Sequence, residues 1–221
     1  MAVNAALAGL VMLIVGDSHI AATSFFNDAL QDALVSQGAA VHSFGVCGAA
    51  GADWINPAPI VCGRGERHNS EPARIDTQHN LRGWALPDLI NKYKPNLVVI
   101  ELGDTLAGYG VMPTLPRALI DEQVRELLIP IKSRNLPCIW IGPPWGTEGG
   151  PYKKTNARLK EVSDYLAQVV APCKYIDSTQ FSKPGEWPTR DGIHLTLQAT
   201  RVWDNHLITS IDQIARQMPR R

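Results

Sequence analysis

The sequence has no excess of charge of either sign and no apolar run long enough to cross a membrane. Its 221 residues include 21 Lys and Arg against 21 Asp and Glu, so nothing in the charge indicates nucleic acid or an anionic membrane surface as a partner. No apolar stretch approaches the roughly 18 to 20 residues of a transmembrane helix. The first nine residues carry no basic segment, and we expect no intact signal peptide there. Nothing indicates an oligomeric state.

The motifs that mark two other hydrolase classes are also missing or incomplete. Gly-x-Ser-x-Gly, which places the nucleophile in α/β-hydrolases, does not occur. Asp17 and His19 form an Asp-x-His pair and Gly103-Asp104 could supply a second ligand block, as in a metallophosphoesterase. The Gly-Asn-His-Asp/Glu block and the later Gly-His pair of such enzymes are absent, however. We therefore keep that class as an alternative and predict neither a metal nor another cofactor.

Cysteine is scarce, with four residues in the chain. The pairing that joins cysteines expected to be neighbours is Cys47 with Cys62 and Cys138 with Cys173. Four cysteines allow three pairings, however, and four buried thiols are the alternative. Disulfides would favour a periplasmic or secreted protein over a cytoplasmic one.

Apolar strand patterns alternate with helical patterns along the chain. Because 45% of residues are hydrophobic and 19% charged, the composition fits one globular domain over residues 1–221. The alternation predicts an α/β fold, a parallel five-stranded sheet between two helical layers. Residues 46–81 have no clear period and are expected to form a long active-site loop. The expected strands are Val11 to Val15, Ala40 to Phe44, Leu97 to Leu102, Cys138 to Ile141 and Tyr175 to Ile176; the expected helices are Ile20 to Gln37, Trp84 to Lys92, Arg117 to Arg134, Tyr152 to Val170 and Leu197 to Arg216.

Two short motifs carry the candidate chemistry. The first apolar run breaks into Gly16-Asp17-Ser18, and Asp191 and His194 stand three residues apart near the other end of the chain. A serine at the carboxyl end of a buried strand lies where α/β sheets gather ligands. Its hydroxyl needs a base, and an unperturbed imidazole titrates near pH ~6.5. Ser18 could instead cap a helix, and Asp191 could belong to a turn.

These motifs, in this order, resemble the SGNH hydrolases, also called the GDSL family. The resemblance covers the chain from about Val11 to His194 and implies a flavodoxin-like three-layer α/β/α fold. It implies Ser18 as nucleophile, His194 as base and Asp191 as the acid that orients it. The oxyanion hole would be formed by Ser18 and Gly48, with Thr105 at the position where the family usually has Asn.

The resemblance implies a serine esterase that acts without a cofactor on an acylated small molecule or glycan. Residues 46–81 include several Arg and His side chains, which suit sugar hydroxyls better than acyl chains. We therefore predict removal of short acyl groups, chiefly O-acetyl, from a carbohydrate or polysaccharide outside the cytoplasm, and the resemblance adds that many bacterial members of the family are carbohydrate esterases. Trp145 and Trp187 could stack on a sugar ring. A lipase or thioesterase of the same family and an inactive glycan-binding relative are the alternatives.

Overall fold

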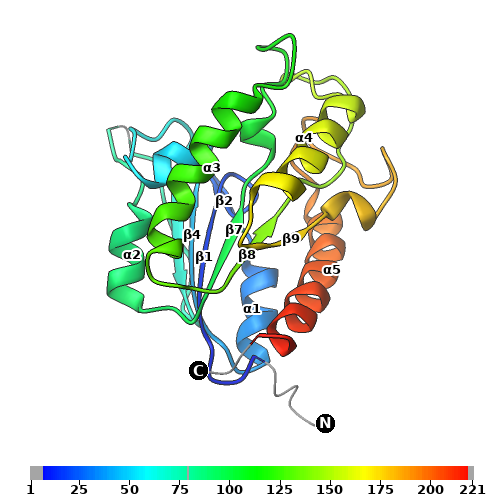
Figure 1. Cartoon of the computed structure of the whole chain (residues 1–221). Coiled ribbons are helices and arrows are strands. Elements are labelled where there is room, and N and C mark those ends of the chain that lie inside the picture. The colour runs from blue at the N-terminus through cyan, green and yellow to red at the C-terminus, as the bar shows by residue number, and fades with distance from the viewer. Residues whose placement is uncertain (1–6, 79, 219–221) are drawn as a thin grey trace.

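A seven-stranded sheet lies at the centre of the computed structural model, which describes residues 7–78 and 80–218 (Figure 1). The strand order is β6-β5-β4-β1-β7-β8-β9, and β2 and β3 form a separate short pair. The strands are β1 Val11–Gly16, β2 Ala21–Ala22, β3 Phe25–Phe26, β4 Ala40–Val46, β5 Arg64–His68, β6 Arg74–Asp76, β7 Leu97–Glu101, β8 Cys138–Ile141 and β9 Lys174–Ile176.

The five strands expected from the sequence are β4, β1, β7, β8 and β9, and they pair in parallel. If these five strands are numbered 1 to 5 by their order in the sequence, their order across the sheet is 2-1-3-4-5, which is that of flavodoxin-like sheets. Every residue of β7 and β8 is buried, because helices cover both faces of the sheet. The predicted α/β fold is therefore confirmed.

Residues 46–81 depart from the expected loop. They contain β5 and β6, which extend the sheet beyond β4 by antiparallel pairing. Strand β5 reads RGERH and strand β6 reads RID, so neither carries the apolar run that marks a buried strand. Charged side chains are typical of a sheet edge, where they discourage pairing with another chain. The rest of this segment includes the short helix η1 Gly51–Trp54.

Helices form a layer on each face of the sheet. One hydrophobic cluster packs α2, α3 and α4 against one face, and a second packs α1 and α5 against the other. None of the described helices is apolar enough over sufficient length to cross a membrane. The helices are α1 Asp28–Ser36, α2 Leu86–Tyr93, α3 Arg117–Lys132, α4 Asn156–Val169 and α5 Leu197–Arg216, and the remaining short ones are η2 Asp104–Leu106 and η3 Ser178–Gln180.

The helix expected to begin at Ile20 begins at Asp28 instead. Its cap is Asn27, whose side chain accepts a hydrogen bond from the Leu30 amide. The residues before it form one turn followed by β2 and β3. Ser18 consequently does not cap a helix.

Asp204, on α5, is a buried carboxyl with one partner. Asn27 Nδ2 donates to its Oδ1 over 2.9 Å, and its Oδ2 has no partner among the described residues. Burial raises the pKa of Asp204 to about 7 from 3.8. Because this pKa is higher in the folded than in the unfolded protein, ionisation costs stability progressively as pH rises from about 4 to about 7.

We expect Asp204→Asn to stabilise the protein more at about pH 8 than at about pH 5, because the amide cannot ionise. The expected difference between the two pH values is on the order of 2–3 kcal/mol of unfolding free energy. Urea unfolding of wild type and variant at both pH values measures it. A gain that is the same at both would contradict the assignment.

Candidate active site

The carboxyl ends of three neighbouring strands bring the sequence-predicted residues together at the top of Figure 1. Ser18 follows β1 by two residues, Gly48 follows β4 by two residues, and Thr105 lies in η2 after β7. All three line one cavity of about 350 Å³, together with His194 from the loop before α5. This arrangement follows from the parallel pairing, which places these strand ends at the same edge of the sheet.

Ser18, His194 and Asp191 form a continuous hydrogen-bonded chain. Ser18 Oγ lies 2.7 Å from His194 Nε2, and His194 Nδ1 lies 2.6 Å from Asp191 Oδ2. The other carboxylate oxygen of Asp191 accepts hydrogen bonds from the amides of His194 and Ile193. Burial would raise the pKa of Asp191, but these hydrogen bonds from His194 and Ile193 hold it below its ordinary value. An ionised Asp191 fixes the imidazole with its proton on Nδ1, which leaves Nε2 free to accept the Ser18 proton.

A neighbouring hairpin holds the loop that carries Asp191 and His194. The Thr147 amide donates to the Gly192 carbonyl over 3.1 Å, and the Thr147 and Thr189 hydroxyls lie 2.8 Å apart. Gly150 packs so closely on the Asp191 carbonyl that a Cβ there would come within 2.5 Å of its oxygen. The loop that carries His194 is therefore held by contacts from a second segment of the chain.

Three hydrogen-bond donors that belong to residues lining the cavity are without partners. In the described part of the chain, the amides of Ser18 and Gly48 donate no hydrogen bond. Thr105 Oγ1 is buried and likewise has no partner among these residues. Unpaired donors beside a nucleophile are what an oxyanion hole requires, because they remain available for the charge that develops during acyl transfer.

Both expected disulfides are present, Cys47–Cys62 and Cys138–Cys173. The first ties the residue before Gly48 to Cys62 in the segment that precedes β5, and both of its cysteines line the cavity. It therefore restrains the backbone that presents the Gly48 amide. The second joins the start of β8 to the residue before β9.

Asp104 is a buried carboxylate at the edge of the cavity, and no pattern in the sequence indicated its partners. Lys154 Nζ lies 2.9 Å from one of its oxygens, and His19 Nε2 lies 3.0 Å from the other. The Tyr109 hydroxyl donates to it over 2.8 Å. Burial would raise the pKa of Asp104, but the Lys154 ammonium and His19 hold it well below its ordinary value. Its negative charge is therefore neutralised locally.

Two further buried carboxyl groups, those of Asp17 and Glu101, lie next to the end of β1 that precedes Ser18. Burial raises the pKa of Glu101 well above its ordinary value, and the charge of Asp17 raises it further. Asp17 Oδ1 accepts a hydrogen bond from the His19 amide over 3.0 Å, whereas Asp17 Oδ2 and both carboxyl oxygens of Glu101 have no partner among the described residues. Ligand atoms of Asp17, His19 and Glu101 lie within 4.8 Å of one another, a spacing that a metal ion could also occupy.

Two substrate-binding expectations are wrong. Trp145 and Trp187 are only 8% and 7% exposed, so neither offers a ring face to a sugar. The Trp145 indole packs inward and donates to the Thr179 carbonyl over 2.9 Å. An indole ring buries a large apolar area, and here that burial serves the core.

The polar side chains of residues 46–81 also lie away from the cavity. Arg67 is buried in ion pairs with Asp28 and Asp32, and His68 packs against His42 and Tyr93. His79 lies outside the described residues. The parts of the segment that do line the cavity are the disulfide, Gly48 and Val61.

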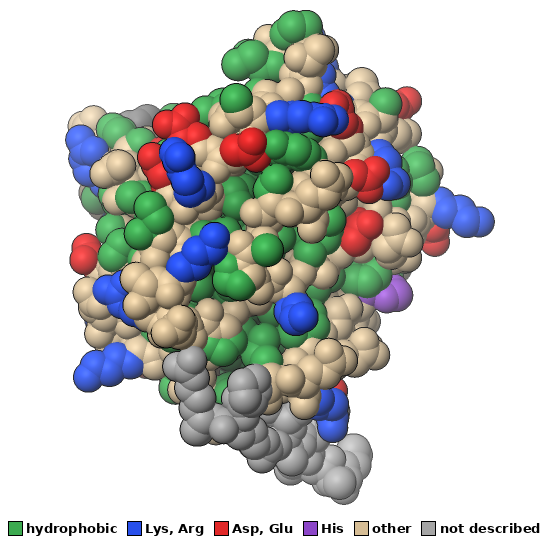
Figure 2. All heavy atoms as spheres, viewed as in Figure 1, with side chains coloured by type: hydrophobic (Ala, Val, Ile, Leu, Met, Phe, Trp, Pro, Cys, Tyr) green, Lys and Arg blue, Asp and Glu red, His purple; other side chains and the backbone are tan. Residues whose placement is uncertain are grey.

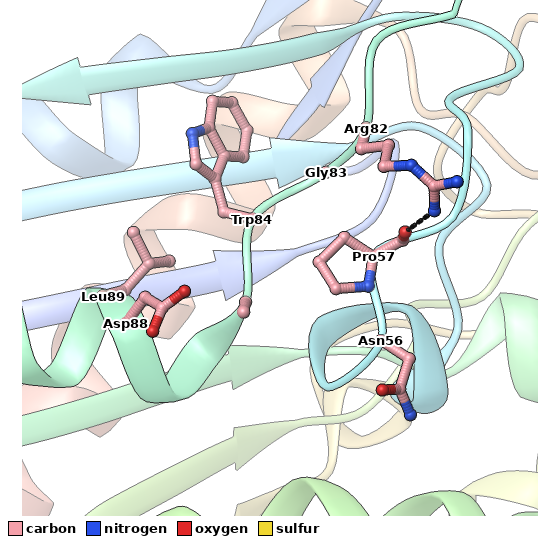
Figure 3. A pocket seen from close by; sticks show the side chains of 8 residues that line it. Asn56, Pro57, Arg82, Gly83, Trp84, Asp88 and Leu89 are labelled. Carbon is pink, nitrogen blue, oxygen red and sulfur yellow. Dashed lines mark hydrogen bonds between the residues drawn. The ribbon is translucent and has the colours of Figure 1, made fainter.

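A separate cleft of about 600 Å³ lies between the residues after η1 and the start of α2 (Figure 3). Asn56, Arg82, Trp84 and Asp88 line it, and the Arg82 guanidinium donates to the Pro57 carbonyl over 2.7 Å. The Arg64 guanidinium lies 4.5 Å from the centre of the Trp84 ring. This cleft shares no lining residue with the cavity around Ser18.

Comparisons with known proteins identify one relative in sequence and many in fold. No family model matches the chain. Protein BcsX from Komagataeibacter xylinus is 39% identical over 206 residues, which cover 93% of this chain and 78% of that protein.

Solved structures match at low identity over almost the whole chain. A GDSL-like lipase from Bacteroides thetaiotaomicron has a TM-score of 0.59 and 14% identity, covering 96% of this chain and 94% of its own. The acetylxylan esterase Axe2 from Geobacillus stearothermophilus, as a catalytic mutant, has a TM-score of 0.58 and 14% identity, covering 92% and 94%. The chain therefore has the fold of the SGNH hydrolases, as its motifs predicted, and it belongs to the family of protein BcsX.

Proposed function

We propose that the protein is a serine esterase that removes short acyl groups, chiefly acetyl, from a carbohydrate. The observation that carries the proposal is the hydrogen-bonded chain from Ser18 Oγ through His194 to Asp191, beside unpaired donors in one cavity. A serine at the end of a strand needs none of these neighbours for a structural role. Nucleophilic acyl transfer needs all of them.

The reaction proceeds through an acyl-enzyme. Ser18 Oγ attacks the ester carbonyl carbon while His194 Nε2 takes the hydroxyl proton, and the carbonyl oxygen becomes an oxyanion. When the tetrahedral intermediate collapses, His194 gives that proton to the departing alcohol oxygen. A water molecule then attacks the acyl group with His194 again as base, which releases the carboxylic acid and restores Ser18. Asp191 stays ionised throughout and stabilises the imidazolium.

The oxyanion is held by the amides of Ser18 and Gly48 and by Thr105 Oγ1. Thr105 occupies the position where the family usually has Asn. The residue lines the cavity, and its hydroxyl, which is shorter than an Asn side chain, is buried without a partner among the described residues. Asp104, next to it, would oppose the developing charge if unpaired. Lys154, His19 and Tyr109 pair it instead.

We expect Thr105→Ala to lower kcat about ten- to a few hundredfold with little change in KM, because this hydrogen bond strengthens only in the transition state. Thr105→Ser keeps the hydroxyl and is the matched control, with most of the activity retained. Steady-state kinetics on one soluble acetate ester measures both. An unchanged kcat in Thr105→Ala would mean that the two amides suffice.

The carbohydrate assignment is supported by the solved structures that share the fold. Several of these are acetylxylan esterases, including Axe2 and an enzyme called AlAXEase. The polar character of residues 46–81 no longer supports it, because those side chains point elsewhere. The two disulfides support action outside the cytoplasm.

A lipase or thioesterase activity is the second candidate, since exposed apolar side chains line part of the cavity. A series of nitrophenyl esters from acetate to octanoate, run beside acetylated polysaccharides, separates the two. We expect the highest kcat/KM on acetate and release of acetate from at least one polysaccharide, both lost in Ser18→Ala. Preference for octanoate without acetate release would replace the proposal with the second candidate.

A further inference from the structure

An aromatic side chain that the proposed mechanism does not use lies at the mouth of the cavity. Tyr152 is 44% exposed, and its ring centre lies 5.9 Å from that of His194 with the two planes at 80°. Tyr152 lines the cavity together with Ser18 and His194. A large ring that is left half in water beside the catalytic base has apolar surface available for a ligand.

The hairpin that carries Tyr152 is held in place from below. Gly149 and Lys154 exchange two backbone hydrogen bonds of 2.8 and 3.1 Å on either side of Tyr152. Lys154, 1% exposed, anchors the end of the hairpin to Asp104 and to the Pro144 carbonyl. The ring is thus presented by an anchored segment, so binding a ligand there costs little ordering of the backbone.

Two further apolar side chains line the same cavity from other loops. Val61 is 81% exposed and Val111 is 80% exposed. Val111 belongs to the loop between β7 and α3, which rises at the top of Figure 1, and Figure 2 shows hydrophobic atoms gathered on that protrusion. We call Val61, Val111 and Tyr152 the apolar rim. Three separate segments of the chain therefore each place an exposed apolar side chain at one opening.

Because Tyr152 lies next to His194, its position indicates which half of a bound ester Tyr152 would contact. His194 Nε2 must reach the departing alcohol oxygen in order to protonate it. The alcohol half of the substrate consequently lies on the His194 side of the cavity, next to Tyr152. The C–H face of a pyranose ring is flat and apolar, and it complements an aromatic ring.

We propose that Tyr152 is the specificity-determining residue that stacks against the sugar ring carrying the ester, with Val61 and Val111 contacting the apolar faces of adjoining sugar rings. This inference rests on the proposed function and adds the contact that selects a cyclic alcohol. An acyl chain would instead extend from the carbonyl carbon, away from the departing oxygen.

The test compares Tyr152→Ala with Tyr152→Phe on two acetate esters. Acetylated xylooligosaccharide offers sugar rings, whereas triacetin has an acyclic alcohol and lacks any ring. Tyr152→Ala should lower kcat/KM on the oligosaccharide about tenfold, mainly through KM, and change it less than about twofold on triacetin. Tyr152→Phe keeps the ring and should retain wild-type values on both.

A binding measurement removes turnover from the comparison. In a Ser18→Ala background, calorimetric titration with the acetylated oligosaccharide should show about tenfold weaker affinity when Tyr152→Ala is added. Val61→Ser combined with Val111→Ser should weaken binding further as the oligosaccharide lengthens. Ile129→Ser, which removes an exposed apolar side chain on α3, is the matched control and should leave binding unchanged.

The possible failures are distinguishable. Equal losses on both esters in Tyr152→Ala would mean that the residue only supports the His194 loop. No loss on either ester would mean that Tyr152 does not contact the substrate. Either result would overturn this inference and leave the proposed function standing. A loss confined to esters of longer acids would assign the rim to the acyl chain and overturn it as well. If the wild type hydrolyses triacetin but no acetylated glycan, the carbohydrate part of the proposed function fails together with this inference.

Discussion

We expect Ser18→Ala and His194→Ala each to lower kcat for ester hydrolysis by roughly 10⁴- to 10⁶-fold while the protein stays folded. The first removes the atom that attacks the carbonyl, and the second removes the base that lies 2.7 Å from it. Because the two residues act as one unit, the double variant should be little worse than either single variant. Kinetics on a soluble acetate ester, with thermal unfolding of each variant, provides the measurement.

Controls for this prediction come from the same protein. Ser36 is an exposed serine on α1 and His206 an exposed histidine on α5, and alanine at either position should leave kcat unchanged. Retention of most activity in Ser18→Ala, or a double variant whose loss is the product of the single losses, would contradict the assigned roles.

Lys154→Met lowers the free energy of unfolding by about 3–5 kcal/mol, because it leaves the Asp104 carboxylate buried without its cation. At about 2–4 °C per kcal/mol for a chain of this size, the melting temperature should fall by roughly 6–20 °C. Adding Asp104→Asn removes the uncompensated charge and should restore a large part of the loss. Calorimetry or circular dichroism on the two single variants and the double variant measures the coupling.

The ion pair of Lys160 with Asp164 on α4 is the matched control, since both side chains are about half exposed. Lys160→Met should change the unfolding free energy by less than about 1 kcal/mol. If Lys154→Met were no more destabilising than Lys160→Met, or if Asp104→Asn gave no recovery, the Lys154 pair would not support the hairpin that carries Tyr152.

The parts of the structure that local sequence determines were predictable. The parallel strands are continuous apolar runs because both of their faces are buried, and Asp191 and His194 belong to one short loop, so their proximity is almost local. Cys47 and Cys62 also lie close in sequence. Ser18 is distant from His194 along the chain, and only the shared order of motifs with a known family indicated that they meet.

The remaining features depend on tertiary contacts that no local pattern encodes. Strands β5 and β6 are rich in charged residues at one end of the sheet, where β6 is the edge strand, and so they lack the apolar signal. Trp145 could have faced solvent or the core, and the partner of its indole, the Thr179 carbonyl, lies 34 residues away. Asp104 and Lys154 are 50 residues apart. The exposed position of Tyr152 likewise follows only from how its hairpin packs.

The most direct test of the central claim, that Ser18 is the nucleophile activated by His194, is covalent labelling. The folded protein is treated with a fluorophosphonate, digested, and examined by mass spectrometry. We expect a single phosphonylated site at Ser18, much slower labelling in His194→Ala, and no labelling in Ser18→Ala. A preparation that hydrolyses esters without labelling at Ser18, or a label that persists in Ser18→Ala, would contradict the account.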